Sequence, residues 1–324
     1  MKILSAVCII LGCFLGAGFV SGREVASYFS RFGGISYFSC IVCGILFFVL
    51  TMFFFSISNR VKSSSEFVSV YFKKYSTLAE WLFAVCIVIL IGSMIAGTSS
   101  LAGSLGYNKL IFVSLTIVLT FLVVNKNVKG ISNINLVLVP ILILVLCITI
   151  SSGDNDIVGY ENGIGAIFSG TAYVFINIVS LGLLIIEIGA NYSRKEKLII
   201  SILSTIVIIG LLLGINHSII TNDLVNDIMP NLTLSQRNMA LYVVMQISIY
   251  LGLFTTLISN VFLLSKFIEK YTKNLTMSII LSLMIGWLIS LFGFDNIVGF
   301  VYIFIAIIGF GMVIGSRKGV VVFK

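Results

Sequence analysis

The chain is poor in charged residues and almost without proline and histidine. Only 10% of its 324 residues are Asp, Glu, Lys or Arg, and it has 2 prolines and 1 histidine. Soluble domains carry about 25% charged residues, so this composition excludes a soluble globular enzyme. The sequence also lacks a Walker A motif, an HExxH motif, a Gly-x-Ser-x-Gly motif and paired carboxylates within its apolar runs. Since nothing here can hydrolyse ATP, any transport must be driven by a gradient.

What the chain does have is apolar sequence. Apolar residues make up 59% of it, and the mean hydropathy is +1.17. A helix needs about 20 mostly apolar residues to cross a hydrocarbon core of about 30 Å. Ten candidate segments can be laid out, at about 4–31, 35–58, 79–103, 109–124, 131–150, 164–189, 198–220, 238–267, 275–292 and 296–314. We therefore expect an all-α integral membrane protein, with residues 1–324 forming one transmembrane domain.

The cysteines give no sign of a cofactor. All six lie within apolar runs, and Cys40-x-x-Cys43 has the spacing of a redox pair or a metal site. No histidine or carboxylate stands near this pair, so buried small hydrophobes are the favoured interpretation. We expect no bound cofactor other than a coupling ion.

The basic residues predict the orientation in the membrane. If the N-terminus is cytoplasmic, 16 of the 20 Lys and Arg residues fall on the inner side. The outer loops then hold acidic residues, namely Asp154, Asp156, Glu161, Asp223, Asp227 and Asp295. By the positive-inside rule, both termini are cytoplasmic in a multi-pass cell-membrane protein. The net charge of +8 is therefore a topology signal and not a sign of nucleic-acid binding.

The ten segments divide into two halves of five, about 1–150 and about 160–314, and each half opens on a long segment rich in glycine. In the first, Gly12, Gly16, Gly18 and Gly22 fall within eleven residues. Glycine weakens a helix, and a bilayer tolerates irregular backbone only where protein or a water-filled cavity satisfies it. We expect segments 1 and 6 to be interrupted and to run in opposite directions. Such paired breaks mark the binding site of many transporters.

The predicted substrate site therefore surrounds the break in segment 1. A half-helix N-terminus favours anionic groups, so we expect a substrate carboxylate at the N–H groups of Gly18, Phe19 and Val20. Phe19 and Tyr173 would cover the site. The full predicted set is Gly16, Gly18, Phe19, Val20, Ser21, Tyr173, Asn177 and Ser180. For Asn177, a helix–helix hydrogen bond is the alternative role.

Arg23 and Glu24 follow the glycines at an uncertain depth. They could gate the outer mouth, pair with substrate, or lie at the interface with buried stems. Glu24 could also carry a proton in a proton-coupled carrier. These alternatives stay open at the level of sequence.

Segment 8 contains a small group of hydroxyl side chains. Thr255, Thr256 and Ser259 share one helix face through spacings of three and four. Together with free carbonyls they could form an oxygen cage for a small cation. Alternatively, each hydroxyl bonds back to its own helix.

The residues from Gly16 to Val25 read Gly-Ala-Gly-Phe-Val-Ser-Gly-Arg-Glu-Val. This run is similar to the Gly-Ala-Gly-Phe-Ala-Ser-Gly-Arg/Gln-Glu-Ile sequence of the YkvI-type bacterial membrane proteins, with Val20 where alanine is usual. These proteins are regarded as amino-acid permeases of the amino acid–polyamine–organocation group, with a largely unassigned substrate. The resemblance implies a LeuT-like fold of five plus five helices related by an inverted repeat.

The same resemblance implies a sodium site. In sodium symporters of that fold, one cation lies between segment 1 carbonyls and segment 8 hydroxyls. Carried over to this sequence, the ligands are the carbonyls of Gly12, Leu15 and Gly252 and the hydroxyls of Thr255 and Thr256. Some proton-coupled relatives place a segment 5 lysine here, and residues 131–150 contain none, which favours sodium.

The sequence thus predicts a secondary active transporter, most simply a sodium symporter for a small amino-acid-like zwitterion or carboxylate, working by alternating access. A channel or a non-transporting sensor that keeps the transporter fold is an alternative from another class. An integral membrane enzyme is disfavoured because no catalytic constellation is present.

Overall fold

The computed structural model describes residues 2–153 and 162–321, and over those ranges the chain is helical without a β-strand. The predicted outer residues Asp154, Asp156 and Glu161 lie outside this part. The first five predicted segments correspond to α1 (Lys2–Phe14) with α2 (Ala17–Val20) and α3 (Arg23–Tyr28), α4 (Ser36–Ile57), α6 (Ser76–Ser104), α7 (Lys109–Val124) and α8 (Asn127–Thr149). The second five correspond to α9 (Gly163–Gly189), α10 (Arg194–Thr221), α12 (Met239–Thr272), α13 (Leu275–Ser290) and α14 (Phe294–Val321).

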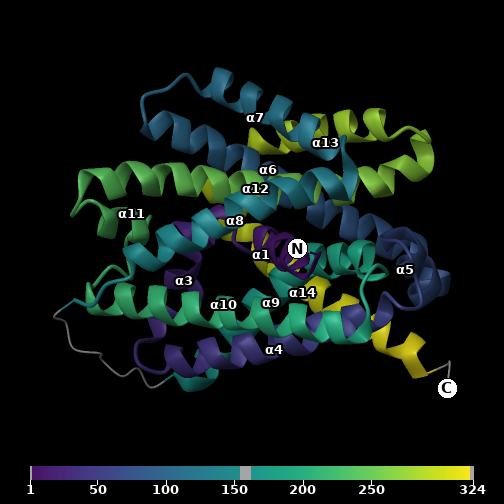
Figure 1. The fold of residues 1–324 in the computed structure, drawn as a ribbon, viewed down its shortest axis with the longest axis horizontal. Coiled ribbons are helices and arrows are strands. Elements are labelled where there is room, and N and C mark those ends of the chain that lie inside the picture. The colour runs from purple at the N-terminus through teal and green to yellow at the C-terminus, as the bar shows by residue number, and fades with distance from the viewer. Residues whose placement is uncertain (1, 154–161, 322–324) are drawn as a thin grey trace.

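Two further α-helices of the described residues fall in connections where the sequence predicts loops, and two short 3-10 helices, η1 (Ser30–Phe32) and η2 (Lys73–Tyr75), complete the described elements. The two α-helices are α5 (Ser64–Phe72), which precedes α6, and α11 (Pro230–Ser235), which precedes α12. Figure 1 places α5 and α11 at opposite ends of the long helices. They therefore cover the two ends of the helix assembly.

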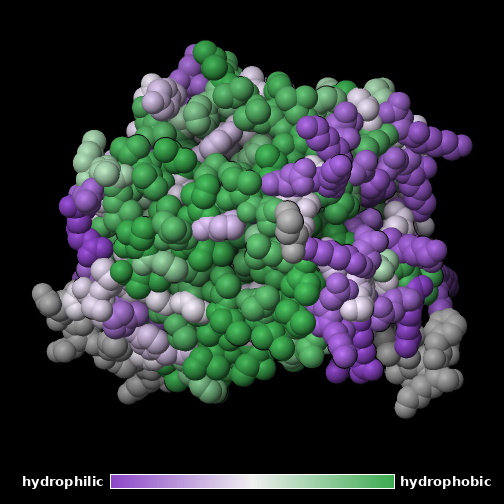
Figure 2. Space-filling model, in the orientation of Figure 1, coloured by the Kyte–Doolittle hydropathy of each residue, from purple (hydrophilic) through white to green (hydrophobic). Residues whose placement is uncertain are grey.

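The outer surface matches a protein that spans a membrane. Within residues 2–153 and 162–321, six helices are long and apolar enough to cross a bilayer, as judged by length and composition, and several shorter apolar helices accompany them. Figure 2 shows a broad hydrophobic band over the middle of the molecule, with hydrophilic residues gathered mainly at the end where α5 lies. Many large apolar side chains are exposed, for example Leu110 at 72% and Phe168 at 72%, as expected for contact with lipid.

Helix α1 lies at the centre of the assembly. It packs against α8, α9, α10 and α12. Contacts also recur in corresponding pairs: α1 with α8 is matched by α9 with α14, and α8 with α12 is matched by α14 with α6. Such matching is what two structurally similar halves produce.

The predicted interruption of segment 1 is confirmed. α1 ends at Phe14 and α2 starts at Ala17, because Gly16 adopts an extended conformation with φ −69° and ψ 174°. A second break follows at Gly22, whose φ of +84° is the left-handed region that favours glycine. The first membrane segment is therefore three short helices rather than one.

The predicted interruption of segment 6 is wrong, since α9 runs without a break from Gly163 to Gly189. Its glycines permit close packing instead. A Cβ at Gly170 would lie 2.5 Å from Ser39 Oγ, and one at Gly182 would lie 2.9 Å from the Phe54 ring. Both contacts are with α4, so these glycines bring two helices together.

Candidate functional site

A small cavity lies beside the break in segment 1. Its volume is about 20 Å³, which is room for about one water molecule. The cavity is bounded by α1, α3, α6, α9, α12 and α14. The lining residues are Cys13, Phe14, Gly16, Glu24, Leu90, Met94, Ile176, Asn177, Ser180, Thr256, Asn260 and Tyr302.

Glu24 lines this cavity and is half-buried. The second break turns α3 so that the Glu24 side chain covers Gly18, where a Cβ would collide with its carboxylate. The Tyr173 hydroxyl donates a hydrogen bond of 2.9 Å to Glu24 Oε2. No ion pair within residues 2–153 and 162–321 includes Glu24. Its carboxylate thus reaches the centre of the protein without a cationic partner.

Aromatic rings surround Tyr173. Its ring centroid lies 5.7 Å from that of Phe14, 5.3 Å from that of Tyr28 and 5.6 Å from that of Phe29. The contacts with Phe14 and Phe29 are edge-to-face, the arrangement that aromatic quadrupoles favour. These contacts hold the phenol of Tyr173 in place against Glu24.

Two asparagines of the lining are oriented by their own helices. Asn177 Nδ2 donates to the Tyr173 carbonyl at 3.0 Å, and Asn260 Nδ2 donates to the Thr256 carbonyl at 3.0 Å. A carbonyl only accepts, so the nitrogen atoms must face the helix backbone. Each Oδ1 is left free, and that of Asn260 is buried without a partner. The bond of Asn177 is therefore within α9 rather than between helices.

Helix α11 covers the second break from the predicted outer side. The Asn231 N–H donates to the Ser21 carbonyl and Asn231 Nδ2 to the Val20 carbonyl, both at 2.9 Å. These bonds satisfy backbone groups that the break releases. Arg23 Nη1 also points this way and donates to the Asp227 carbonyl at 3.3 Å. Of the two predicted gating residues, Arg23 thus contacts the outer cover and Glu24 lines the cavity.

The predicted cation ligands lie where α1 and α12 meet. Thr256 Oγ1 donates to the Gly12 carbonyl across the two helices at 3.1 Å. Thr255 Oγ1 donates to the Gly252 carbonyl at 3.1 Å, which is a bond within α12. The Leu15 carbonyl oxygen would lie 3.2 Å from a Cβ at Gly252. These bonds and contacts place the five residues together where segment 1 faces α12.

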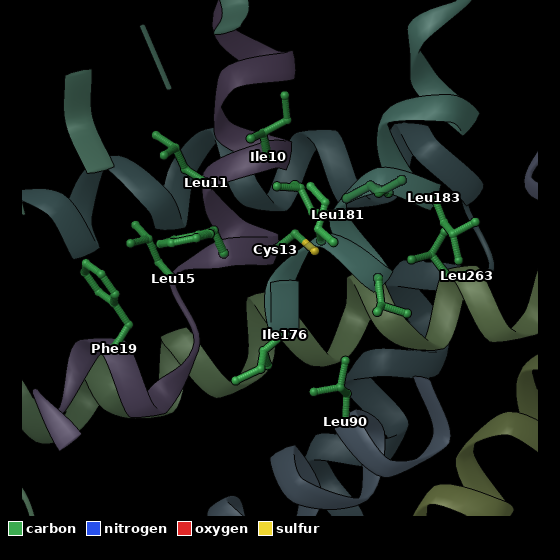
Figure 3. Close-up of a cluster of buried hydrophobic side chains, with 14 of the residues drawn as sticks. Ile10, Leu11, Cys13, Leu15, Phe19, Leu90, Ile176, Leu181, Leu183 and Leu263 are labelled. Atoms are coloured by element: carbon green, nitrogen blue, oxygen red, sulfur yellow. The ribbon is translucent and has the colours of Figure 1, made fainter. Parts of the chain in front are cut away.

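The predicted substrate residues divide into two groups. Three of the eight line the cavity, namely Gly16, Asn177 and Ser180. The other five are not among its lining residues: Gly18, Phe19, Val20, Ser21 and Tyr173. Figure 3 shows Phe19 beyond the break from Cys13 and Leu15. Phe19 is fully buried and packs edge-to-face against Phe14, with 5.7 Å between centroids.

The expectation that Val20 offers a free N–H does not hold in this structure. That N–H donates to the Gly16 carbonyl at 2.9 Å, since α2 is one short helical turn. The Val20 side chain packs against Gly252, where a Cβ would lie 2.9 Å from Val20 Cγ2. The Ser21 hydroxyl donates to the Gly18 carbonyl at 3.3 Å. Val20 and Ser21 therefore shape the break but do not face the cavity.

Sequence reasoning missed Asn135 of α8. It is fully buried, and neither Nδ2 nor Oδ1 has a hydrogen-bond partner. Its amide lies against Gly12, where a Cβ would be 2.8 Å from it. A buried polar side chain without a partner is costly, so Asn135 marks this contact as more than packing. The sequence does show an asparagine within an apolar run, which indicates a polar role. It does not show that Asn135 lies beside Gly12, because that contact depends on how α8 packs on α1.

A larger apolar groove of about 550 Å³ lies between α7 and α13, lined by side chains such as Val113 and Trp287. It has almost no polar groups and belongs to the hydrophobic band. The small cavity beside the break carries the polar groups and is the candidate site.

Comparisons with known proteins place this geometry in a fold class. The chain has the LeuT fold: it matches MhsT in complex with L-phenylalanine with a TM-score of 0.66 and 15% identity, over 97% of this chain and 87% of MhsT. It also matches Mhp1, a nucleobase-cation-symport-1 family transporter, in a closed conformation with bromovinylhydantoin bound. That match has a TM-score of 0.63 and 12% identity, and it covers 91% of this chain and 74% of Mhp1.

A closer relative appears in sequence. The chain is 30% identical over 147 residues to the membrane protein YkvI of Bacillus subtilis (strain 168), and the aligned stretch covers 44% of this chain and 42% of YkvI. This confirms the resemblance to YkvI over that stretch, which is less than half of either protein. No family model matches the chain.

Proposed function

We propose that this protein is a sodium-coupled secondary transporter for a small amino-acid-like solute, working by alternating access. One observation carries the proposal: the Gly12 carbonyl of the broken segment 1 and the Thr256 hydroxyl of α12 meet at 3.1 Å, and Thr256 also lines the polar cavity. The fold neighbours support two parts of it: MhsT has L-phenylalanine bound, which supports an amino-acid-like solute, and Mhp1 is a nucleobase-cation-symport-1 family transporter, which supports coupling to a cation.

The oxygen cluster suits a sodium ion because hard cations prefer oxygen ligands. Gly12, Leu15 and Gly252 offer carbonyls, while Thr255 and Thr256 offer hydroxyl lone pairs. The unpartnered amide of Asn135 beside Gly12 adds a further polar group to this region. To bind the ion, Thr256 must turn its hydrogen away from the Gly12 carbonyl so that both oxygens face the cation.

Thr256 also provides the coupling between ion and solute. It bonds to Gly12 on the cation side and lines the cavity on the other. A solute that fixes the rotamer of Thr256 changes the affinity for the ion, and by linkage the ion changes the affinity for the solute equally. Symport requires this reciprocity.

Alternating access requires a cover on each side of the cavity. On the predicted outer side the cover is α11, bonded through Asn231 to the second break. On the predicted inner side, Glu187 at the end of α9 accepts hydrogen bonds of 2.7 Å from the Ser64 N–H and hydroxyl at the start of α5. We infer that these two sets of bonds break in turn.

A proton-coupled carrier is the second candidate, and the position of Glu24 in the cavity favours it. Uptake of amino acids, amines and carboxylates into proteoliposomes, with a sodium gradient or a pH gradient, separates the two. Sodium-dependent accumulation supports the proposal, and accumulation driven by pH alone supports the second candidate. Currents far above carrier rates would indicate a channel.

A further inference from the structure

Four polar side chains that line the cavity keep a hydrogen-bond acceptor: Glu24, Asn177, Asn260 and Thr256. Glu24 uses Oε2 to accept from Tyr173 and keeps Oε1. Asn177 and Asn260 point their nitrogens at their own helix backbones, so that each has a free Oδ1. The hydrogen of the Thr256 hydroxyl is donated to Gly12, so its oxygen can only accept.

Few donors balance these acceptors. The hydroxyls of Ser180 and Tyr302 are the neutral donors of the lining besides the weak Cys13 thiol, which lies 3.6 Å from Ser180 Oγ. No Lys, Arg or His is among the residues that line the cavity. Arg23, the nearest cation in sequence, donates away from it to Asp227. The Glu24 carboxylate also covers Gly18, where the sequence predicted that a substrate carboxylate binds.

The negative charge of Glu24 must be balanced by a cation or by strong hydrogen bonds. A charge inside the membrane region is costly unless it is paired or strongly hydrogen-bonded, and Tyr173 gives Glu24 a single hydrogen bond. Aromatic side chains stand around it: Phe14 and Tyr302 line the cavity, and Tyr28 packs on Tyr173. Aromatic faces attract cations, so the rings and the Glu24 carboxylate both favour a positively charged ligand.

We propose that the solute is recognised as an organic cation, through a protonated primary amine whose counter-ion is Glu24, and that it needs no carboxylate. An ammonium group has three donors and no acceptor, and the cavity offers free acceptors on Glu24, Asn177 and Asn260. This inference rests on the proposed function in taking the cavity as the solute site, and it names the class of solute. The solute body is admitted when alternating access widens the cavity.

The test compares ligands that share a carbon skeleton. The probes are three triplets of amino acid, amine and acid: alanine, ethylamine and propanoate; leucine, isoamylamine and 4-methylpentanoate; phenylalanine, phenethylamine and 3-phenylpropanoate. Binding to the full-length protein in detergent is read from the rise in melting temperature with ligand concentration. In at least one triplet we expect the amine and the amino acid to bind and the acid not to bind.

Glu24→Gln tests the assigned counter-ion, because glutamine keeps the size of the side chain and an oxygen for the Tyr173 hydroxyl. We expect it to lower amine affinity at least tenfold, since charge-assisted hydrogen bonds are the strong ones, while Glu24→Asp retains part of the affinity. Glu196→Gln, which removes a hydrogen-bonded carboxylate at the start of α10, away from the cavity and from both covers, should bind the amine as the unaltered protein does.

The inference is overturned if an acid binds and its amine does not, if none of the three amines binds, or if Glu24→Gln binds the amine unchanged. Uptake into proteoliposomes is scored separately. An amine that binds through Glu24 but is never accumulated contradicts the proposed transport and leaves the amine site standing. Sodium-driven uptake of the acids alone supports transport and contradicts the amine site.

Discussion

Thr256→Val tests the proposed cation site with the least change in shape, because valine is nearly isosteric with threonine. Thr256 is 6% exposed, and its hydroxyl makes the one hydrogen bond that joins α12 to the Gly12 carbonyl. Removing one partner of a buried hydrogen bond costs about 1–3 kcal/mol. If the same hydroxyl is an ion ligand, a loss of about 1.4 kcal/mol raises the half-saturating sodium concentration about tenfold.

The assay is sodium dependence of uptake in proteoliposomes at fixed solute concentration. We expect a rise of about tenfold in the half-saturating sodium concentration for Thr256→Val, with a smaller change in solute affinity at saturating sodium. Ser259→Ala is the matched control, since its hydroxyl bonds only to the Thr255 carbonyl of its own helix. It should leave sodium dependence unchanged.

The reasoning fails if Thr255→Val and Thr256→Val both keep the sodium dependence of the unaltered protein. The two hydroxyls would then serve only the helix backbone and the Gly12 contact. Loss of protein yield in Thr256→Val is separated from this outcome by measuring its melting temperature.

Three further predictions concern the break and the topology. Gly18→Leu should abolish transport while the protein still inserts in the membrane, because the new side chain displaces Glu24; uptake per inserted protein measures this. Asn231→Ala removes the side-chain hydrogen bond from α11 to the Val20 carbonyl and keeps the backbone bond to Ser21; we expect Cys13 in the cavity to react several-fold faster with a thiol reagent added outside, as measured by peptide mapping. Cysteines at the exposed positions Lys74 and Asn226 should be labelled by an impermeant reagent from the inside and from the outside, respectively.

Each of these has a result that contradicts it. Gly210→Leu is the control for Gly18→Leu, since a Cβ at Gly210 meets no atom within 4 Å; equal activity in both variants would show that Gly18 needs no space. An unchanged rate at Cys13 in Asn231→Ala would mean that the Asn231 side chain does not hold the outer cover closed. Labelling of Lys74→Cys from outside intact cells would reverse the whole topology.

The break in segment 1 could be predicted from sequence because it depends on local backbone energy. The cluster from Gly12 to Gly22 disfavours a regular helix wherever it is placed. The glycines of α9 look similar in sequence but meet Ser39 and Phe54 of α4, so they serve packing. Glycine composition alone does not distinguish a broken helix from a closely packed one, and the prediction for segment 6 failed for this reason.

The parts of the site that could not be predicted depend on which helices face each other. Tyr302 and Asn260 line the cavity, and Asn135 meets Gly12, through packing that no spacing in the sequence encodes. The depth of Glu24 depends on the turn at Gly22, which folds α3 back over Gly18. A regular helix after the first break would place the carboxylate elsewhere.

The central claim is that a sodium gradient drives solute through this protein. The most direct measurement is uptake of the amine or amino acid that binds best, in proteoliposomes that have sodium outside and potassium inside. We predict accumulation above the external concentration that disappears when potassium replaces the external sodium or when an ionophore dissipates the gradient. Accumulation that is equal with and without sodium, or uptake that never exceeds equilibration, would contradict the claim.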